Sequence, residues 1–404
     1  MPAPLANESA VTPSLRVAAV ASHPIQYQAP LFRALAQSPA IDFSVLFVTM
    51  PNAAQQGRGF GIPFTWDIPL LEGYRWNKID EVRGRVGLDA FFAMRVAGPR
   101  ALLREMDPDV LILTGWHIWP LVQMLLAARS LRIPVIMRGE SNDLRRRAWY
   151  ARLLHRMLLG LCAAFLPIGQ ANRNFYCRYG VAERAMFDAP YFIDNERFAQ
   201  TAAALESRRA AVRAKWAIPE NATCFLYAGK LEPKKRILDV LEGLRQAREK
   251  TTAEIHLLVV GTGQLMDEAK AIVKRDQLPV SFAGFLNQTE IPASYVACDC
   301  LVLASDFGET WGLVVNEAMA CGRPAIVSDR VGCGPDLVTP GVTGDIFPFG
   351  DTQALAHCLV HAAEDPARLQ AMGKAACERV TRDYSVDRSA EGTIKAIQFV
   401  RGFA

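Results

Sequence analysis

Two glutamates separated by seven residues are the first feature of this sequence that suggests chemistry. Glu309 lies in a polar, glycine-containing loop after an apolar run, and Glu317 lies in the apolar stretch that follows. We expect Glu309 in a loop and Glu317 about one turn into a helix. Carboxylates accept hydrogen bonds from sugar hydroxyls, and a helix start attracts phosphate. The pattern suits a ligand with hydroxyls at both ends and phosphate between, although an ordinary acidic surface helix would carry the same charges.

A second group of candidates is cationic. The segment YAGKLEPKKR places Gly229, Lys230 and Lys235 directly after an apolar run that ends at residue 228. A diphosphate leaving group needs positive charge and N–H donors as its bond to the sugar breaks. A solvated basic loop would look the same. A further glycine, Gly263, belongs to a GTG turn that is not a complete GxGxxG motif, and a tight turn explains it equally well.

The elements that position these residues alternate between short apolar runs and longer helical patterns. Strands are expected over 15–21, 43–49, 110–114, 135–138 and 164–168, and again over 224–228, 254–260, 280–283, 300–304 and 325–328. Helical patterns, such as 29–37, 119–131, 237–250 and 265–275, lie between them. Such alternation predicts parallel sheets with crossover helices, so the fold class is α/β with two Rossmann-like doubly wound domains facing across a cleft.

The length of 404 residues exceeds what one hydrophobic core usually organises, so two domains are expected. We expect a first domain over 1–195 and a second over 196–380, divided near 190–198. The last segment, 381–404, contains an amphipathic helix expected over about 386–401, which could cross back to the first domain. Ligands of such sheets bind beyond the carboxyl ends of the strands, which is where the candidate residues lie.

Composition limits the classes of function. Half of the residues are hydrophobic (51%) and no apolar run reaches the length of a membrane span. The first fourteen residues lack the features of a signal peptide, and the nine scattered cysteines suit a reducing cytosol. Residues 1–195 carry 21 Lys and Arg against 15 Asp and Glu. This basic half suggests an acidic partner, but no nucleic-acid-binding motif accompanies it, so nucleic acid is not expected.

The second half resembles the family-4 glycosyltransferases, which have the GT-B fold. ETWGLVVNEAMACGRPAIVSD resembles their E-x7-E signature, and YAGKLEPKKR, VVGTGQL and FAGFLNQTEIPASYVACD follow in the family's order and spacing. The resemblance is specific over about 222–350 and vaguer in the first half. It implies a retaining glycosyltransferase that moves a sugar from a UDP- or GDP-sugar to a glycan or lipid-linked acceptor, in polysaccharide or glycoconjugate biosynthesis.

Residue by residue, the resemblance assigns the donor site. Lys230 and Lys235 would bind the pyrophosphate, Glu309 the donor sugar and Glu317 the ribose. Lys230 is more usually arginine, which puts bidentate phosphate contact in doubt. Further donor-binding positions are Gly229, Gly263, Phe285, Leu286, Thr310, Trp311, Gly312, Leu313 and Val314. In this set Phe285 and Leu286 would line the base pocket, and backbone groups of 310–314 would follow the sugar and phosphates.

The first half departs from the family pattern, because the loop after its first strand is polar instead of glycine-rich. His23, Gln26 and Tyr27 in that loop could reach the donor phosphate or the acceptor. His117 resembles the family's histidine near the donor sugar, although a lone histidine is more often structural. Arg138 and Glu140 also follow a strand and should face the acceptor side of the cleft.

The resemblance implies transfer with retention, without metal or other cofactor, by front-face attack in which the leaving phosphate takes the acceptor proton. Asp107-Pro108-Asp109 matches a DxD metal motif, but it precedes a strand and so should lie at the wrong end of the sheet. Lys230, Lys235, Glu309 and His117 are therefore the expected catalytic group.

The segment from Arg145 to Arg156 mixes cations with aromatic and leucine residues. Such a stretch can lie on an anionic membrane, which would make the protein cytoplasmic and peripheral, or it can pack on the first domain. Three rival functions remain: an inactive nucleotide-sugar-binding partner subunit, a GT-B sugar-nucleotide epimerase or hydrolase, and a dehydrogenase. A dehydrogenase is disfavoured, because this sequence lacks the complete GxGxxG motif that such an enzyme needs.

Overall fold

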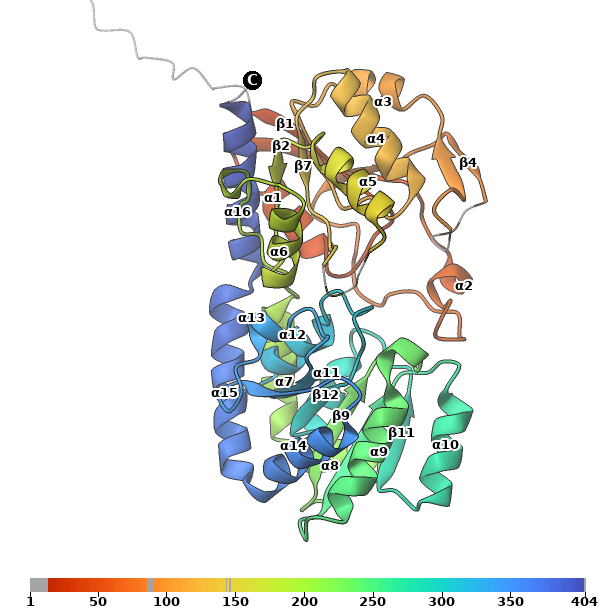
Figure 1. Ribbon diagram of the computed structural model, residues 1–404, viewed down its shortest axis with the longest axis vertical. Coiled ribbons are helices and arrows are strands. Elements are labelled where there is room, and N and C mark those ends of the chain that lie inside the picture. Colours follow the sequence, from red (N-terminus) through yellow and green to blue (C-terminus); the bar gives the residue numbers. More distant parts are fainter. Residues whose placement is uncertain (1–13, 86, 88–89, 143, 145–146, 403–404) are drawn as a thin grey trace, which may run out of the picture.

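The protein consists of two α/β lobes stacked end to end, as the computed structural model shows (Figure 1). The structure describes residues 14–402 except 86, 88–89, 143 and 145–146. The C-terminal helices α15 and α16 run along one side of both lobes (Figure 1). The first lobe is built by the N-terminal half of the chain together with α16, and the second by the residues between.

Each lobe contains a six-stranded sheet in which all neighbouring strands are parallel. The order is β3-β2-β1-β6-β7-β8 in the first lobe and β11-β10-β9-β12-β13-β14 in the second. The first-lobe strands are β1 (Leu15–Ala21), β2 (Ile41–Phe47), β3 (Arg75–Lys78), β6 (Val110–Leu113), β7 (Val135–Met137) and β8 (Ala164–Phe165). The second-lobe strands are β9 (Thr223–Ala228), β10 (Ile255–Val260), β11 (Val280–Gly284), β12 (Cys300–Leu303), β13 (Ala325–Ser328) and β14 (Gly344–Phe347). A hairpin of β4 (Val82–Gly84) and β5 (Met94–Val96) stands apart.

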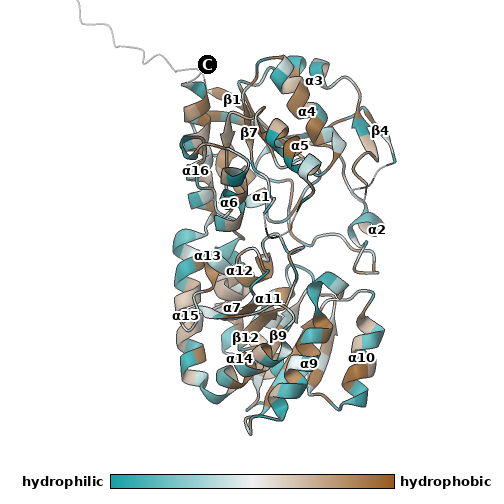
Figure 2. Ribbon diagram, in the orientation of Figure 1, coloured by the Kyte–Doolittle hydropathy of each residue, from teal (hydrophilic) through white to brown (hydrophobic). Residues whose placement is uncertain are grey.

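Helices cover the faces of both sheets and turn their apolar sides inward (Figure 2). Those of the first half are α1 (Ala29–Ala36), α2 (Ala53–Gln56), α3 (Pro99–Met106), α4 (Trp119–Ser130), α5 (Trp149–Leu159) and α6 (Gln170–Arg178). Those of the second half are α7 (Asn195–Glu206), α8 (Arg209–Lys215), α9 (Ile237–Arg248), α10 (Met266–Arg275), α11 (Ile291–Ala297), α12 (Leu313–Ala320), α13 (Gly334–Leu337), α14 (Thr352–Glu364), α15 (Pro366–Asp383) and α16 (Val386–Arg401).

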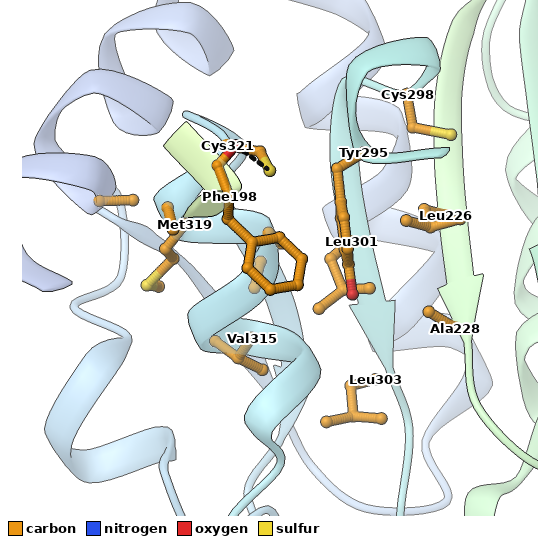
Figure 3. Packing of buried hydrophobic residues seen from close by; sticks show 14 of the residues in the cluster. Phe198, Leu226, Ala228, Tyr295, Cys298, Leu301, Leu303, Val315, Met319 and Cys321 are labelled. Atoms are coloured by element: carbon orange, nitrogen blue, oxygen red, sulfur yellow. Dashed lines mark hydrogen bonds between the residues drawn. The ribbon is translucent and has the colours of Figure 1, made fainter. Parts of the chain in front are cut away.

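The apolar runs form buried strands because both faces of each sheet are covered. In β9, Cys224 and Leu226 pack into the core on one face of the second sheet, whereas Phe225 and Tyr227 pack into the core on the other. This alternation is the period of a strand. Figure 3 shows the first of these cores, where Tyr295 and Leu301 lie between Leu226 of β9 and the helix α12.

The last helix belongs to the first lobe. Ala396, Ile397 and Val400 of α16 are buried with β1 and β2 residues in one core cluster. The chain therefore crosses between the lobes twice. At the junction Gly169 leaves no room for a side chain, because a Cβ there would lie 2.3 Å from Cζ3 of Trp311.

The predicted fold class of two doubly wound parallel sheets is confirmed. The edge strands β3 and β14 and the β4–β5 hairpin were not expected, and the expected strand at 43–49 is shifted to Ile41–Phe47. No helix among the described residues is long and apolar enough to cross a membrane.

Candidate functional site

The carboxyl ends of the central strands of both sheets face the gap between the lobes. In each sheet the order of connection reverses between the first and fourth strands of the lobe, which are β1 and β6 above and β9 and β12 below. Ligands bind at such reversal points in open α/β sheets. The loops that follow these four strands carry most of the residues predicted from the sequence.

Lys235 and Glu309 lie against each other at the reversal point of the second lobe. Lys235 ends a short 3-10 turn (Pro233–Lys235) after β9, and Glu309 lies in the loop after β12. The Lys235 ammonium donates to Glu309 Oε2, which also accepts from Ser305 Oγ at 3.3 Å. Both partners are largely buried, with 16% and 15% of their side chains exposed. The Lys235 ammonium, which can bind phosphate, and the Glu309 carboxylate, which can accept hydrogen bonds from hydroxyls, therefore lie side by side.

Two glycines allow the loops after β9 and β10 to touch through their backbones. A Cβ on Gly261 would lie 1.9 Å from the carbonyl oxygen of Gly229, and one on Gly263 would lie 2.8 Å from the Leu231 nitrogen. Gly261 and Gly263 have φ of +121° and +157°. Close packing therefore explains the GTG turn, whether or not a ligand approaches it.

Lys230 reaches across to the first lobe. Its Nζ donates to the carbonyl oxygen of Arg58 at 3.3 Å and lies 4.9 Å from the centre of the Phe60 ring. Burial lowers the pKa of Lys230, while Glu232 opposes that shift. Arg58 and Phe60 belong to residues 57–67 of the first lobe, which we call the strap.

The strap also covers the predicted base pocket. The ring of Phe285 lies 4.4 Å from that of Phe64 and 5.1 Å from that of Phe60. Asn287 Nδ2 donates to the Thr65 carbonyl at 2.8 Å. A cavity of about 710 Å³ opens between the strap and the loops after β9 and β10. Leu286, the other predicted base contact, packs partly into the second-lobe core.

Glu317 is fully buried in α12 and is bonded to two tyrosines. Tyr295 OH donates to Oε2 at 2.6 Å and Tyr27 OH donates to Oε1 at 3.0 Å. Burial raises the pKa of Glu317, and the tyrosine hydrogen bonds oppose that shift. Tyr27, predicted on the acceptor side, therefore contacts the residue predicted to bind ribose.

The start of α12 leaves backbone donors available. No side chain caps this helix, and Gly312 precedes it with φ of +102°. Leu313 and Val314 are partly exposed. The Trp311 side chain is instead buried, with Nε1 donating to Asn316 Oδ1 at 2.8 Å, so its ring belongs to the core between the lobes.

A second cavity, of about 550 Å³, joins first-lobe residues to the loop that carries Glu309. His23, His117 and Glu140 line it together with Thr310. Burial lowers the pKa of His23 to about 4, and His117 acts in the same direction. Burial also lowers the pKa of His117, while the charge of Glu140 opposes that shift. Both rings are therefore held neutral, as hydrogen-bonding groups that resist gaining a proton.

Glu140 is fixed by two hydroxyls. Tyr191 OH donates to one oxygen at 2.6 Å, and Thr310 Oγ1 donates to the other at 3.4 Å. Arg138 adjoins this group but is not among the residues that line the cavity. Its guanidinium lies over the Tyr191 ring at 5.3 Å and donates to Ser389 Oγ of α16 at 3.3 Å.

Gln26 is buried beside Tyr27, to which its side chain is hydrogen-bonded. The strap, Tyr191 and Tyr295 were not predicted as site residues. An aromatic-rich, unperiodic stretch at 57–67 was the only sequence signal for the strap.

The two aspartates of the DxD-like motif form ion pairs with Arg16. Asp107 and Asp109 accept hydrogen bonds from the Arg16 side chain at the amino end of the first sheet. Within the described ranges there is no cluster of three or more His, Cys, Asp or Glu side chains that could hold a metal ion.

Comparisons with known proteins agree on one family. The model of the family described as glycosyl transferases group 1 matches residues 208–379. The chain is 33% identical over 172 residues to a glycogen synthase of Mycobacterium tuberculosis, a match that covers 42% of this chain and 40% of that protein. It is 30% identical over 315 residues to a GDP-mannose-dependent alpha-mannosyltransferase of the same organism, covering 72% of this chain and 76% of that protein. The chain thus spans less than half of the glycogen synthase.

Solved structures share the whole architecture. A glycosyltransferase of Rickettsia africae superposes with a TM-score of 0.72 at 12% identity, covering 96% of this chain and 99% of that one. Anabaena HepE in complex with UDP and glucose gives a TM-score of 0.67 at 15% identity, covering 95% and 99%. These likenesses confirm the GT-B fold expected from the sequence.

Proposed function

The chain belongs to the group 1 glycosyl transferases, and from that premise we propose that it transfers a sugar from a UDP- or GDP-sugar to a glycan or lipid-linked acceptor. The observation that carries the proposal is the contact of Lys235 with Glu309 at the reversal point of the second sheet, beside an uncapped helix start. A diphosphate and a sugar hydroxyl need these groups together.

The second lobe would hold the donor. The diphosphate would lie at the start of α12, where Lys235 and Lys230 supply positive charge and backbone N–H groups donate. Glu309 would accept hydrogen bonds from sugar hydroxyls, and Glu317 from the ribose. In the ligand-free protein the Glu309 carboxylate pairs with the Lys235 ammonium. An arriving phosphate would compete with this carboxylate for Lys235, and the released carboxylate would then bind the sugar.

We assign the enzyme to the retaining family-4 branch, with front-face attack and no metal. The acceptor oxygen would bond to the anomeric carbon as the bond from that carbon to the phosphate oxygen breaks, and the acceptor proton would pass to the departing phosphate. Lys235 would stabilise the negative charge on that phosphate. The fixed state of Glu140 supports this choice, because both of its oxygens already accept hydrogen bonds and it is poorly free to act as a nucleophile.

The first-lobe cavity would take the acceptor. Its neutral histidines, His23 and His117, and its opening toward Thr310 suit a hydroxyl nucleophile that must approach the donor sugar. A polysaccharide or glycoconjugate end would fit its volume of about 550 Å³.

An anionic membrane surface would bring a lipid-linked acceptor to this cavity. One face of α5 exposes large apolar side chains, of which Trp149 is 76% exposed; the others are Tyr150, Leu153, Leu154 and Met157. Arg152 and Arg156 are exposed on the same helix. Arg145 and Arg146 lie outside the described residues, and Arg147 instead lies over the Phe175 ring. An amphipathic helix with arginines among apolar residues suits an anionic bilayer, and we propose a cytoplasmic protein that is peripheral on that surface.

The membrane proposal is tested by sedimentation with neutral and anionic vesicles. Binding to anionic vesicles that is lost in Leu153→Glu but kept in Leu126→Glu would support it, because Leu126 is 45% exposed on another helix, α4. Equal binding by both variants, or no binding by the wild-type protein, would contradict it.

The proposed activity is tested by nucleotide release. The protein is incubated with a panel of UDP-, GDP- and ADP-sugars, with and without EDTA, beside Glu309→Ala and the exposed α15 control Glu378→Ala. Slow release from one donor that resists EDTA and disappears only in Glu309→Ala is expected. Binding without turnover in the presence of acceptor would favour the inactive partner subunit, and conversion of the sugar without release would favour an epimerase.

A further inference from the structure

The carboxylate predicted to bind ribose has no surface open to solvent. Glu317 is 0% exposed, and each of its oxygens accepts a hydrogen bond from a phenol. A ribose hydroxyl could reach this carboxylate only after a group that covers it moves, and the groups hydrogen-bonded to it are the two tyrosines and Gln288.

The two tyrosines differ in origin. Tyr295 belongs to α11 of the second lobe, and its ring is packed in the core beneath α12, next to Leu301 (Figure 3). Tyr27 belongs to the loop between β1 and α1 of the first lobe and is partly exposed. Tyr295 is thus built into the site, whereas Tyr27 reaches it from across the gap.

The surroundings of Tyr27 give its ring room to move. A cavity of about 140 Å³ adjoins it and is lined by polar groups that include Gln26, Asp194, Arg197 and Gln288. A phenol that leaves Glu317 would find hydrogen-bond partners there. The Tyr295 ring, in contrast, is 0% exposed.

We propose that Tyr27 lowers the affinity for the donor. Its hydroxyl occupies the position on Glu317 that a ribose hydroxyl would take, so it must be displaced when the nucleotide binds. The inference rests on the proposed function, in which Glu317 binds ribose. Tyr27 is a first-lobe residue, so its displacement would also release one contact between the lobes when the donor enters.

A contact present only in the free protein weakens binding by the free energy that it contributes. Tyr27→Phe keeps the ring and removes this hydrogen bond to a carboxylate. We therefore expect Tyr27→Phe to bind the nucleoside diphosphate roughly tenfold more tightly than the wild-type protein.

Tyr295→Phe is the matched control, because it makes the same change on the same carboxylate. The hydrogen bond of Tyr295 remains in the bound state and orients Glu317, so its loss should leave affinity unchanged or weaken it. A purely structural role for both tyrosines would lower the melting temperature without tightening binding in either variant.

Titration calorimetry with UDP and with GDP measures the affinity of the full-length wild-type protein and both variants. Tighter binding by Tyr27→Phe alone is the expected result. Tyr27→Leu serves as a second variant that also lacks the hydroxyl, and it should likewise bind more tightly. Unchanged or weaker binding by the Tyr27 variants would overturn the inference, whereas a wild-type protein that binds neither nucleotide nor any nucleotide sugar would instead overturn the proposed function.

Discussion

Replacing Glu309 by glutamine should affect the sugar and the nucleotide of the donor differently: turnover should fall, whereas nucleotide affinity should not. The change keeps the shape of the side chain and removes its charge. In the protein, Oε2 of Glu309 accepts from Lys235 and from Ser305, and only 15% of the side chain is exposed. A hydrogen bond to a charged group contributes about 1.5–3 kcal/mol, so losing one such bond to a sugar hydroxyl slows turnover by roughly 10- to 150-fold.

The nucleotide half should respond differently. Without the carboxylate, Lys235 loses its partner and is free to pair with phosphate. Affinity for UDP or GDP should therefore stay the same or rise, by up to about tenfold, since each 1.4 kcal/mol corresponds to one factor of ten.

The assay combines donor turnover, followed by nucleotide release, with calorimetric binding of UDP and GDP. Glu242→Gln is the control, because Glu242 of α9 pairs with Arg245 outside the cleft and its change should alter neither quantity. Turnover of Glu309→Gln within threefold of wild type, or a parallel loss of nucleotide affinity, would refute the assignment of Glu309 to the sugar.

Three further changes test one contact beside the site and two features of the second-lobe fold. Phe60→Leu should raise the KM for the donor by about three- to tenfold, because it removes the ring under the Lys230 ammonium, and Phe60→Tyr should restore it; equal KM values for both variants would count against this contact. Burial lowers the pKa of His256 to about 4 from 6.5, so the unfolded chain binds more protons and stability is lost as pH falls through that window, by roughly 3 kcal/mol below pH 4. His256→Gln should flatten the denaturation profile between these pH values, and an unchanged slope would contradict the assignment. Gly261→Ala should lower unfolding free energy by about 3 kcal/mol or more, since its Cβ meets a backbone oxygen, whereas Gly322→Ala, with φ of +71° and open space around it, should lose only about 1 kcal/mol; similar melting temperatures would disprove the steric argument.

The sequence predicted the fold well because buried parallel strands are continuous apolar runs. β1 and β13 have the predicted bounds, and α16 begins at Val386 and ends at Arg401 as expected. β3 escaped prediction because all four of its residues, Arg75–Lys78, are exposed at the sheet edge and carry no apolar pattern. β14 is likewise short and only partly buried.

Within the site, prediction worked where position along a strand decides which side chains meet. Lys235 and Glu309 follow strands that are neighbours in the sheet, so the topology alone brings their loops together. The contacts that cross between the lobes could not be predicted in this way. No local pattern indicates that Tyr27 lies on Glu317 or that Phe64 covers Phe285, because both contacts depend on how two separate sheets are placed.

Trp311 illustrates a related limit. Its place in the signature indicates a donor contact, yet its side chain fills the junction between the lobes, where it lies against Gly169 and donates to Asn316. A motif predicts the backbone conformation, whereas the position of a large aromatic side chain depends on which neighbouring core buries it.

The most direct test of the account is a crystal structure of the protein with UDP or GDP, whichever nucleotide it releases from a donor. The account predicts phosphate density between Lys235 and the start of α12, with the ribose on Glu317 and the Tyr27 hydroxyl displaced. Nucleotide bound elsewhere, with the Lys235–Glu309 and Tyr27–Glu317 contacts intact, would contradict it.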